Sequence, residues 1–385
     1  MNILRVLVFP FFLLGANSFI LSGATRRLKS AIKTFESYDN LAMPVSKFQH
    51  YPPGIQKYFR FFHRKFCYYK CSETFPTRRA GGVAGEPGFP ANKFSVSNKI
   101  KALVILSRPE NVLPALVLNF AGGWFANPSL SALMRSPPFF ASSAITTLVM
   151  TYSMFANDLF DIELDRINNP SRPLVTGEIT RAEAISSSVA LIGAAELLNM
   201  YFIPNEQRIV THLAIFVTTI YTPVLKKLCF IKNLACASLV AHTLYFTGRS
   251  VCGSAITNPF LNIATQFIFW GSLQNELLLD ICDAPGDAQN GIQTIPVIFG
   301  RNVAFTMANL IIHFNVIWNL YYSMSRLTNY AHGFILMALC YPLLKGLSAI
   351  KDRSDTNEIK KVIKSTSLPM VMVLFYLCLL RRGNP

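Results

Sequence analysis

The sequence predicts an all-α, polytopic membrane protein, and three observations support that prediction. Hydrophobic residues make up 51% of the 385 residues and charged residues only 15%, below the roughly 25% charged residues of an ordinary soluble domain. The mean hydropathy is positive, at +0.35. Apolar runs recur at nearly even spacing from about residue 102 to the C-terminus, and most are about 20 residues long, enough to cross ~30 Å of hydrocarbon. One helical membrane domain explains this pattern better than several soluble domains.

Nine apolar segments are expected to be transmembrane helices. Their centres lie near residues 112, 145, 193, 216, 243, 269, 312, 339 and 371. If the basic N-terminal region precedes the first span, the connections on its side carry thirteen Lys and Arg residues, whereas the opposite connections carry four, namely Arg135, Arg208, Arg249 and Arg326. The positive-inside rule expects this asymmetry for a nine-span topology. We therefore predict a bundle of about nine helices around a central cavity.

The net charge of +16 does not indicate nucleic-acid binding, because most of it lies ahead of the apolar segments. Residues 1–101 contain 16 Lys and Arg against 4 Asp and Glu. The remaining sequence has no basic stripe interleaved with aromatic residues of the kind that single-strand binding requires. We expect a lipid bilayer, and no nucleic acid, among the partners of this chain.

The N-terminal region is predicted to be a targeting leader. Residues 1–18 resemble a secretory signal peptide, with Arg5 ahead of a short apolar run and small residues at its end. A basic stretch with Ser and Thr follows, as in a transit peptide, and Phe19 fits the aromatic position of bipartite plastid presequences. We divide the chain into a signal peptide (1–18), a leader and linker (19–97) and a membrane domain (98–385), and favour a plastid membrane. A plain signal peptide, a mispredicted start and another endomembrane stay open.

A first acidic motif lies where the second predicted span ends. Asn157, Asp161 and Asp165 are spaced i, i+4 and i+8, which places their oxygens along one face of a helix. Asp158 and Glu163 belong to the same run of residues.

A second acidic motif lies where the sixth predicted span ends. Glu276, Asp280, Asp283 and Asp287 follow one another at i, i+4, i+7 and i+11, again along one helical stripe. Pro285 is expected to break the helix before Asp287, because proline lacks the backbone N–H of a helix interior.

The two motifs together predict a divalent-cation site. A charged side chain that faces lipid at mid-bilayer costs roughly 2.5–3.5 kcal/mol, and like charges at i, i+4 repel each other. Eight of the 20 acidic residues lie in these two runs, so bound cations are needed to neutralise them. Oxygen ligands without Cys or His suit Mg²⁺, which also accepts diphosphate oxygens. The candidate metal ligands are Asn157, Asp158, Asp161, Asp165, Glu276, Asp280, Asp283 and Asp287.

Basic residues on the same side complete a candidate diphosphate site. Arg172, Lys226, Lys227 and Arg301 lie on connections of that side, where Arg binds phosphate as a fork and Lys as a point charge. Each of them, taken alone, is also explained as a charge that sets topology.

These motifs resemble the UbiA superfamily of intramembrane prenyltransferases. The first motif continues with Asn168-x-Pro170-x-Arg172-Pro173, and the second is followed by Gly291-Ile292-Gln293-Thr294-Ile295-Pro296. Weaker matches are Arg108-Pro109-x-Asn111 in the first span and, after the fourth span, Tyr221-Thr222-Pro223, Lys226-Lys227 and Lys232-Asn233-Leu234. The resemblance covers about residues 98–382.

The resemblance implies an enzyme that transfers an isoprenyl group from an isoprenyl diphosphate to a lipophilic acceptor. It implies that two Mg²⁺ ions are organised by Asn157, Asp161, Asp165, Asp283 and Asp287. The four aspartates of this set are the expected catalytic residues. The expected substrate-binding residues are Asn157, Arg172, Lys226, Asn111, Arg108 and Lys227.

The acceptor is left open at this point, and so are two other functions. The motifs are similar both to plastid branches that act on homogentisate or chlorophyllide and to the archaeal-type lipid branch. A soluble isoprenyl diphosphate synthase is disfavoured because its helices are amphipathic. A membrane cation transporter would more often place single acids near mid-span. A non-catalytic family member that binds cations through the acidic cluster also remains an alternative.

Overall fold

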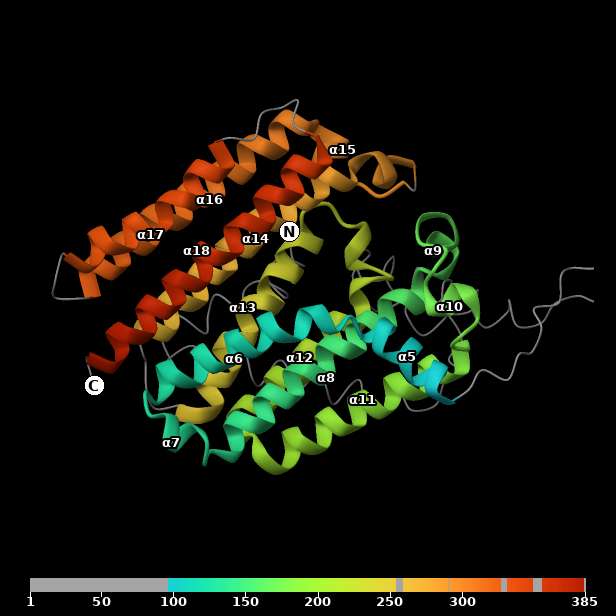
Figure 1. The fold of residues 1–385 in the computed structure, drawn as a ribbon, viewed down its shortest axis with the longest axis horizontal. Coiled ribbons are helices and arrows are strands. Elements are labelled where there is room, and N and C mark those ends of the chain that lie inside the picture. Colours follow the sequence, from blue (N-terminus) through green and yellow to red (C-terminus); the bar gives the residue numbers. More distant parts are fainter. Residues whose placement is uncertain (1–95, 254–258, 290, 327–330, 349–354, 384–385) are drawn as a thin grey trace, which may run out of the picture. The chain divides into compact units, whose positions relative to one another are not determined.

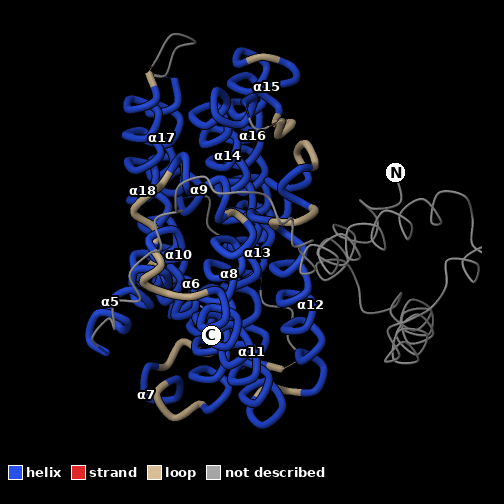
Figure 2. The backbone as a smooth tube through the Cα atoms, turned by 90° about the vertical axis from the view of Figure 1, so that its right-hand side faces the viewer, coloured by secondary structure: helices blue, strands red, loops and turns tan. Residues whose placement is uncertain are grey.

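The computed structural model describes residues 96–253, 259–289, 291–326, 331–348 and 355–383. In these ranges the backbone forms helices joined by turns and loops, without strands (Figure 2). The predicted all-α class is therefore confirmed. The predicted signal peptide and nearly all of the predicted leader and linker lie outside the described residues.

The helices are, in chain order, α5 (Val96–Ser107), η2 (Pro109–Asn111), α6 (Val112–Ala126), α7 (Leu130–Leu133), α8 (Pro137–Phe160), α9 (Ile162–Asn168), α10 (Pro173–Thr176), α11 (Arg181–Phe202), α12 (Asn205–Tyr221), η3 (Leu225–Lys227), α13 (Ile231–Cys252), α14 (Pro259–Gln289), α15 (Ile295–Phe299), α16 (Arg301–Arg326), α17 (Ala331–Ser348) and α18 (Thr356–Gly383).

Local sequence explains several helix ends. Proline occupies the first turn of α8, α10 and α15, where its missing N–H would have no helical partner. Thr180 and Glu183 form a reciprocal capping box at the start of α11. Gly253 and Gly300 end α13 and α15 with φ angles of 70° and 87°, which residues with a Cβ avoid.

Each of the nine predicted segment centres lies inside a helix, but nine membrane spans are not confirmed. By length and apolar composition, four of the described helices, α8, α11, α16 and α18, qualify as spans. The helices on either side of Arg108 qualify together as a fifth, with a bend of 46° between them. The helix α17 is apolar but shorter, and α14 combines apolar residues with the second acidic motif. Sequence hydropathy thus located the helices more securely than it counted spans.

Most of the helices pack in two hydrophobic cores that share α13, and a third core, the smallest, joins α5, α8 and α11. The larger core joins α6, α13, α14, α16, α17 and α18 around residues such as Phe267, Leu277 and Leu374. The smaller core joins α8, α11, α12 and α13 around Ile145 and Phe246. Figure 1 shows α16, α17 and α18, in orange and red, together on one side of α14. The two motifs belong to different cores, since the first ends α8 and the second ends α14.

Large apolar side chains also cover the outside of the helices. Leu113, Tyr201, Ile317 and Phe334 are each at least 66% exposed. An exterior that exposes so many large apolar side chains would be an aggregation liability in water and is the expected surface against lipid.

The predicted helix break at Pro285 is wrong. The helix α14 continues through Pro285 to Gln289, so that Asp283 and Asp287 lie on one helix. Proline removes one hydrogen bond, but here only the last turn follows it, so the loss is confined to the helix end.

Candidate functional site

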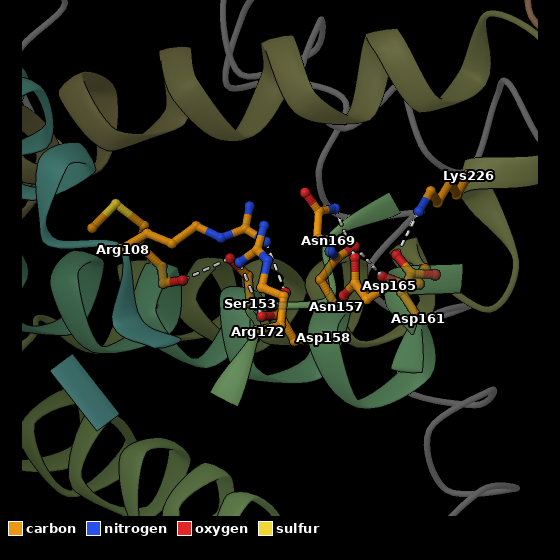
Figure 3. A network of polar contacts seen from close by, with 11 residues as sticks. Arg108, Ser153, Asn157, Asp158, Asp161, Asp165, Asn169, Arg172 and Lys226 are labelled. Atoms are coloured by element: carbon orange, nitrogen blue, oxygen red, sulfur yellow. Dashed lines mark hydrogen bonds and ion pairs between the residues drawn. The ribbon is translucent and has the colours of Figure 1, made fainter. Parts of the chain in front are cut away.

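The first acidic motif spans the joint between α8 and α9. The helix α8 ends at Phe160, and Asp161 is the cap residue of both helices. Backbone hydrogen bonds continue across the joint, from Asp161 N to Asn157 O at 3.0 Å and from Asp165 N to Asp161 O at 2.7 Å. The helical spacing of Asn157, Asp161 and Asp165 predicted from the sequence is therefore kept, and Figure 3 shows the three side chains close to one another.

Asp158, one residue beyond Asn157, lies at the centre of a separate ion-pair cluster. Its side chain is 1% exposed. Arg108 Nη2 donates to Oδ1 at 2.7 Å, and Arg172 Nη1 donates to Oδ2 at 3.1 Å (Figure 3). Both predicted substrate-binding arginines are thus joined through one buried carboxylate.

Two other polar residues of the first motif, Asn157 and Asp161, have partners from a different part of the chain. Lys226 Nζ donates to Asp161 Oδ2 at 2.5 Å, and the Thr222 hydroxyl donates to Asn157 Oδ1 at 3.0 Å. Asp165, which is buried, accepts a hydrogen bond from Asn169 at 3.0 Å. The connection between α12 and α13 therefore packs its polar side chains against the end of α8.

The second motif has its own buried aspartate and its own cation. Asp280 is 2% exposed. Lys232 Nζ lies 2.6 Å from Asp280 Oδ1, and Asn233 Nδ2 donates to Oδ2 at 2.9 Å. Lys232 also interacts electrostatically with Glu276 and Asp287. The first turn of α13 thus neutralises the middle of the second stripe.

The connection that contains η3 brings the two motifs to one site. The helix η3 packs against both α12 and α13, and α13 packs against both α8 and α14. Lys226, which binds Asp161 of the first motif, also interacts electrostatically with Asp287 of the second. The carboxylates of the two motifs therefore share a set of basic side chains.

Some predicted residues are less engaged in this arrangement. Asn111 precedes α6, but its side chain does not cap that helix. Lys227 is exposed, next to the half-buried Lys226, and Asp283 is exposed on α14.

Four residues of the site were not among the predicted site residues, namely Asn169, Thr222, Lys232 and Asn233. Three of them lie in the stretch from Tyr221 to Leu234, which the sequence showed only as a weak motif. A polar stretch between two apolar helices was the one available signal for them.

The donor atoms of the site suit a hard divalent cation. Asn157 and the carboxylates of the two motifs provide oxygen ligands, and the carboxylates outnumber the four basic side chains that contact them. Asp287 Oδ2 is buried and has no hydrogen-bond partner among the described residues. In the same residues, no three His, Cys, Asp or Glu side chains stand together as a metal-binding group. The chemistry of the donors fits Mg²⁺, while the nearest charges of Asp158, Asp161 and Asp280 are Lys and Arg.

Comparison with protein families gives a match to the UbiA prenyltransferase family over residues 113–370. Among curated proteins, the digeranylgeranylglyceryl phosphate synthase of Methanothrix thermoacetophila is 32% identical over 210 residues, which are 54% of this chain and 76% of that protein. The synthase of Natronomonas pharaonis is 28% identical over 263 residues, 67% of this chain and 89% of that protein.

Solved structures share the fold. A UbiA homologue from Archaeoglobus fulgidus bound to GPP and Mg²⁺ has a TM-score of 0.57 at 19% identity and covers 72% of this chain and 98% of its own. A structure of digeranylgeranylglyceryl phosphate synthase in membranes has a TM-score of 0.58 at 22% identity and covers 73% of this chain and 98% of its own. At these identities the likeness concerns the fold alone.

Proposed function

This chain belongs to the UbiA prenyltransferase family, and from that premise we propose that it transfers a geranylgeranyl group from its diphosphate to a glyceryl phosphate lipid. Membership makes it a multi-pass intramembrane prenyltransferase. The donor, the acceptor and the residues that bind them are the part that we propose.

The observation that carries the proposal is the shared set of basic side chains between the two acidic motifs. Lys226 contacts Asp161 at the end of α8, and Lys232, six residues further along the chain, contacts Asp280 of α14. A diphosphate bound there would have cations from the protein on one side and carboxylate-bound metal on the other. The A. fulgidus homologue, which shares this fold, was solved bound to GPP and Mg²⁺, so the fold can hold both together.

We assign Mg²⁺ binding to Asn157, Asp161, Asp165, Asp283 and Asp287. When bound, Mg²⁺ supplies Lewis-acid stabilisation of the charge that develops on a departing diphosphate. Asp158, Asp280 and Glu276, which the sequence also suggested as ligands, are assigned to the surroundings of the site. Both carboxylate oxygens of Asp158 and of Asp280 already have protein partners, whereas the contact of Lys226 with Asp161 involves Oδ2 alone.

The basic residues would orient the donor and receive its leaving group. Arg108 and Arg172 offer planar forks for phosphate oxygens, and Lys226 offers a point charge. These charged side chains are largely buried at helix ends, where an electrostatic contact is stronger than in water. The bond from the prenyl carbon to the diphosphate oxygen breaks, the acceptor hydroxyl oxygen bonds to that carbon, and the hydroxyl proton is released.

The acceptor follows from the relatives. Those at 28–32% identity are named digeranylgeranylglyceryl phosphate synthase, and the named product contains glycerol, phosphate and two geranylgeranyl groups. We therefore propose a glyceryl phosphate that already carries one geranylgeranyl group. Homogentisate and chlorophyllide, the plastid-type acceptors that the sequence left open, have no support among these archaeal relatives, and neither has the plastid location.

The test is a transfer assay with the full chain in membranes. Labelled geranylgeranyl diphosphate and Mg²⁺ are incubated with geranylgeranylglyceryl phosphate, homogentisate or chlorophyllide, and the product mass identifies the acceptor. We expect product with the glyceryl phosphate lipid only, and loss of product when EDTA removes Mg²⁺. Product with another acceptor would overturn the proposed substrate. Metal binding without any product would support the non-catalytic alternative, and Mg²⁺ flux across sealed vesicles would support the transporter.

A further inference from the structure

We propose that Asp158 is a positioning residue that holds Arg108 and Arg172 as one diphosphate clamp, and that it is not a ligand of Mg²⁺. This inference rests on the proposed function. It changes the role of a residue that the sequence placed among the metal ligands.

The geometry commits both oxygens of Asp158 to the two arginines. Oδ1 accepts from Arg108 at 2.7 Å and Oδ2 from Arg172 at 3.1 Å, and the side chain is 1% exposed. On a helix, position 158 is rotated by about 100° from position 157. It is only about 20° from position 165, so Asp158 borders the stripe of metal ligands. Its two ion pairs, drawn in Figure 3, turn its carboxylate toward the arginines.

The two arginines come from separate connections of the chain, so no shared helix aligns their side chains. Arg108 lies between α5 and α6, with a φ of 49° in the left-handed region that residues with a Cβ seldom adopt. Arg172 precedes α10 in an extended conformation. Two guanidinium groups at one place repel each other, and the carboxylate between them offsets that repulsion.

The cluster of Asp158, Arg108 and Arg172 can still bind an anion when the negative charge of Asp158 is included. Two guanidinium charges and one carboxylate leave a net positive charge of about one. Each guanidinium has about five N–H donors, and Asp158 accepts one from each of them. Arg108 Nε is buried without a hydrogen-bond partner among the described residues, a costly state for a donor unless an acceptor reaches it. A diphosphate oxygen would be such an acceptor.

Separate measurements of the affinity for diphosphate and of the affinity for metal distinguish a positioning residue from a metal ligand. The variant Asp158→Asn keeps the shape but lacks the charge, so the arginines lose their anchor. We expect the Kd of inorganic pyrophosphate with Mg²⁺, and the KM for geranylgeranyl diphosphate, to rise by about tenfold to a hundredfold. The affinity for Mn²⁺ alone, measured by electron paramagnetic resonance without diphosphate, should stay within about twofold.

Asp165→Asn is the matched control, since it is the same change in the adjacent stripe. It should weaken Mn²⁺ binding by about tenfold or more. If Asp158→Asn weakens Mn²⁺ binding as much as Asp165→Asn does, or leaves pyrophosphate binding unchanged, the inference is wrong. A wild-type chain that binds no pyrophosphate would overturn the proposed function as well.

A second set of variants keeps the test valid if Asp158→Asn folds poorly. Asp158→Glu retains the charge and should recover most of the pyrophosphate affinity. Arg172→Gln removes one arm of the clamp, so adding Asp158→Asn to it should cost less than Asp158→Asn costs in the wild-type chain. Strictly additive losses of pyrophosphate affinity would show that Asp158 does not act through Arg172.

Discussion

The two acidic motifs differ in how the fold neutralises them. In the first motif, the buried Asp158 is bound by Arg108 and Arg172, which lie 50 and 14 residues away in the sequence. In the second motif, the buried Asp280 is bound by Lys232 and Asn233, which are adjacent residues in the first turn of α13. One motif is thus assembled from separate segments, and the other from a single neighbouring helix.

This difference shows which parts of the site each motif controls. Two planar forks around one carboxylate can hold an anion in a fixed orientation. A single ammonium group among Glu276, Asp280 and Asp287 compensates charge without fixing direction. We infer that the first motif orients the diphosphate and that the second mainly maintains the negative charge that binds metal.

The largest expected effect is on catalysis, and it is the same for both motifs. Asp161→Ala and Asp283→Ala should each reduce prenyl transfer by about a thousandfold, because each removes a proposed ligand of Mg²⁺ at the developing charge. Labelled product per amount of membrane-embedded protein measures the loss. Glu163→Ala is the control, since Glu163 is exposed and its ion pair among the described residues is with Arg166, one turn away. Full activity of either aspartate variant would contradict a shared site.

The next largest effect is on stability, and it should differ between the buried Asp280 and the exposed Asp283 of the second motif. Asp280→Ala should lower the free energy of unfolding by about 3–5 kcal/mol, because it leaves the charge of Lys232 buried without its partner. Asp283→Ala should change it by less than about 0.5 kcal/mol, since Asp283 is exposed. Thermal unfolding in detergent measures both.

A double variant checks the cause of that loss. Adding Lys232→Met to Asp280→Ala removes the uncompensated charge and should recover part of the lost stability. No recovery would indicate that the Asp280 carboxylate acts through packing or through Asn233 rather than through its ion pair.

A smaller effect is expected at a contact between α6 and α13 that lies several helical turns away from Arg108 and Lys232. The helix α6 follows the Arg108 segment, and α13 carries Lys232. A Cβ on Gly122 would lie 2.1 Å from the Leu244 carbonyl oxygen of α13. Gly122→Ala should therefore cost about 1–3 kcal/mol of stability and reduce transfer as well. Gly193→Ala, on α11 with no atom within 4 Å of the new Cβ, should be neutral or stabilising by up to about 1 kcal/mol. Equal effects of the two substitutions would contradict the close approach.

The smallest expected change in stability concerns the segments that follow the two motifs. Thr180 caps α11 through its hydroxyl, whereas the Thr294 hydroxyl, ahead of α15, is buried without a partner among the described residues. Thr180→Val should cost about 1 kcal/mol of stability. Thr294→Val should cost less than about 0.5 kcal/mol, because no hydrogen bond is lost. The same thermal unfolding measurement distinguishes them, and a larger loss at Thr294 would reverse the comparison.

Much of the site could be predicted from spacing alone. Asn157, Asp161 and Asp165 were expected on one helical face, and the backbone bonds across Asp161 keep that spacing. Asp158, one residue away, has the same chemistry and was assigned to the same metal. Asp165 is buried as well, so the two arginine partners are what distinguish Asp158. These partners come from other segments of the chain.

Other features were beyond the reach of sequence patterns because they depend on packing. Pro285 was expected to end its helix, yet α14 continues through it. Lys232 and Asn233 stood out in the sequence only as part of a weak family match after the fourth span, which assigned them no role in the site. Their role became visible only where α13 and α14 pack together and Asp280 lies 2.6 Å from Lys232 Nζ.

The amino-acid sequence by itself determined the helical class, the positions of the nine apolar segments within helices and the two acidic stripes, because helical periodicity and hydropathy are local properties of a chain. The tertiary structure alone decided which acidic side chain each basic side chain neutralises. It also decided that Asp158 pairs with Arg108 and Arg172. Ion pairs and burial arise between segments that the sequence separates, and a carboxylate takes its role from the charges that packing places beside it.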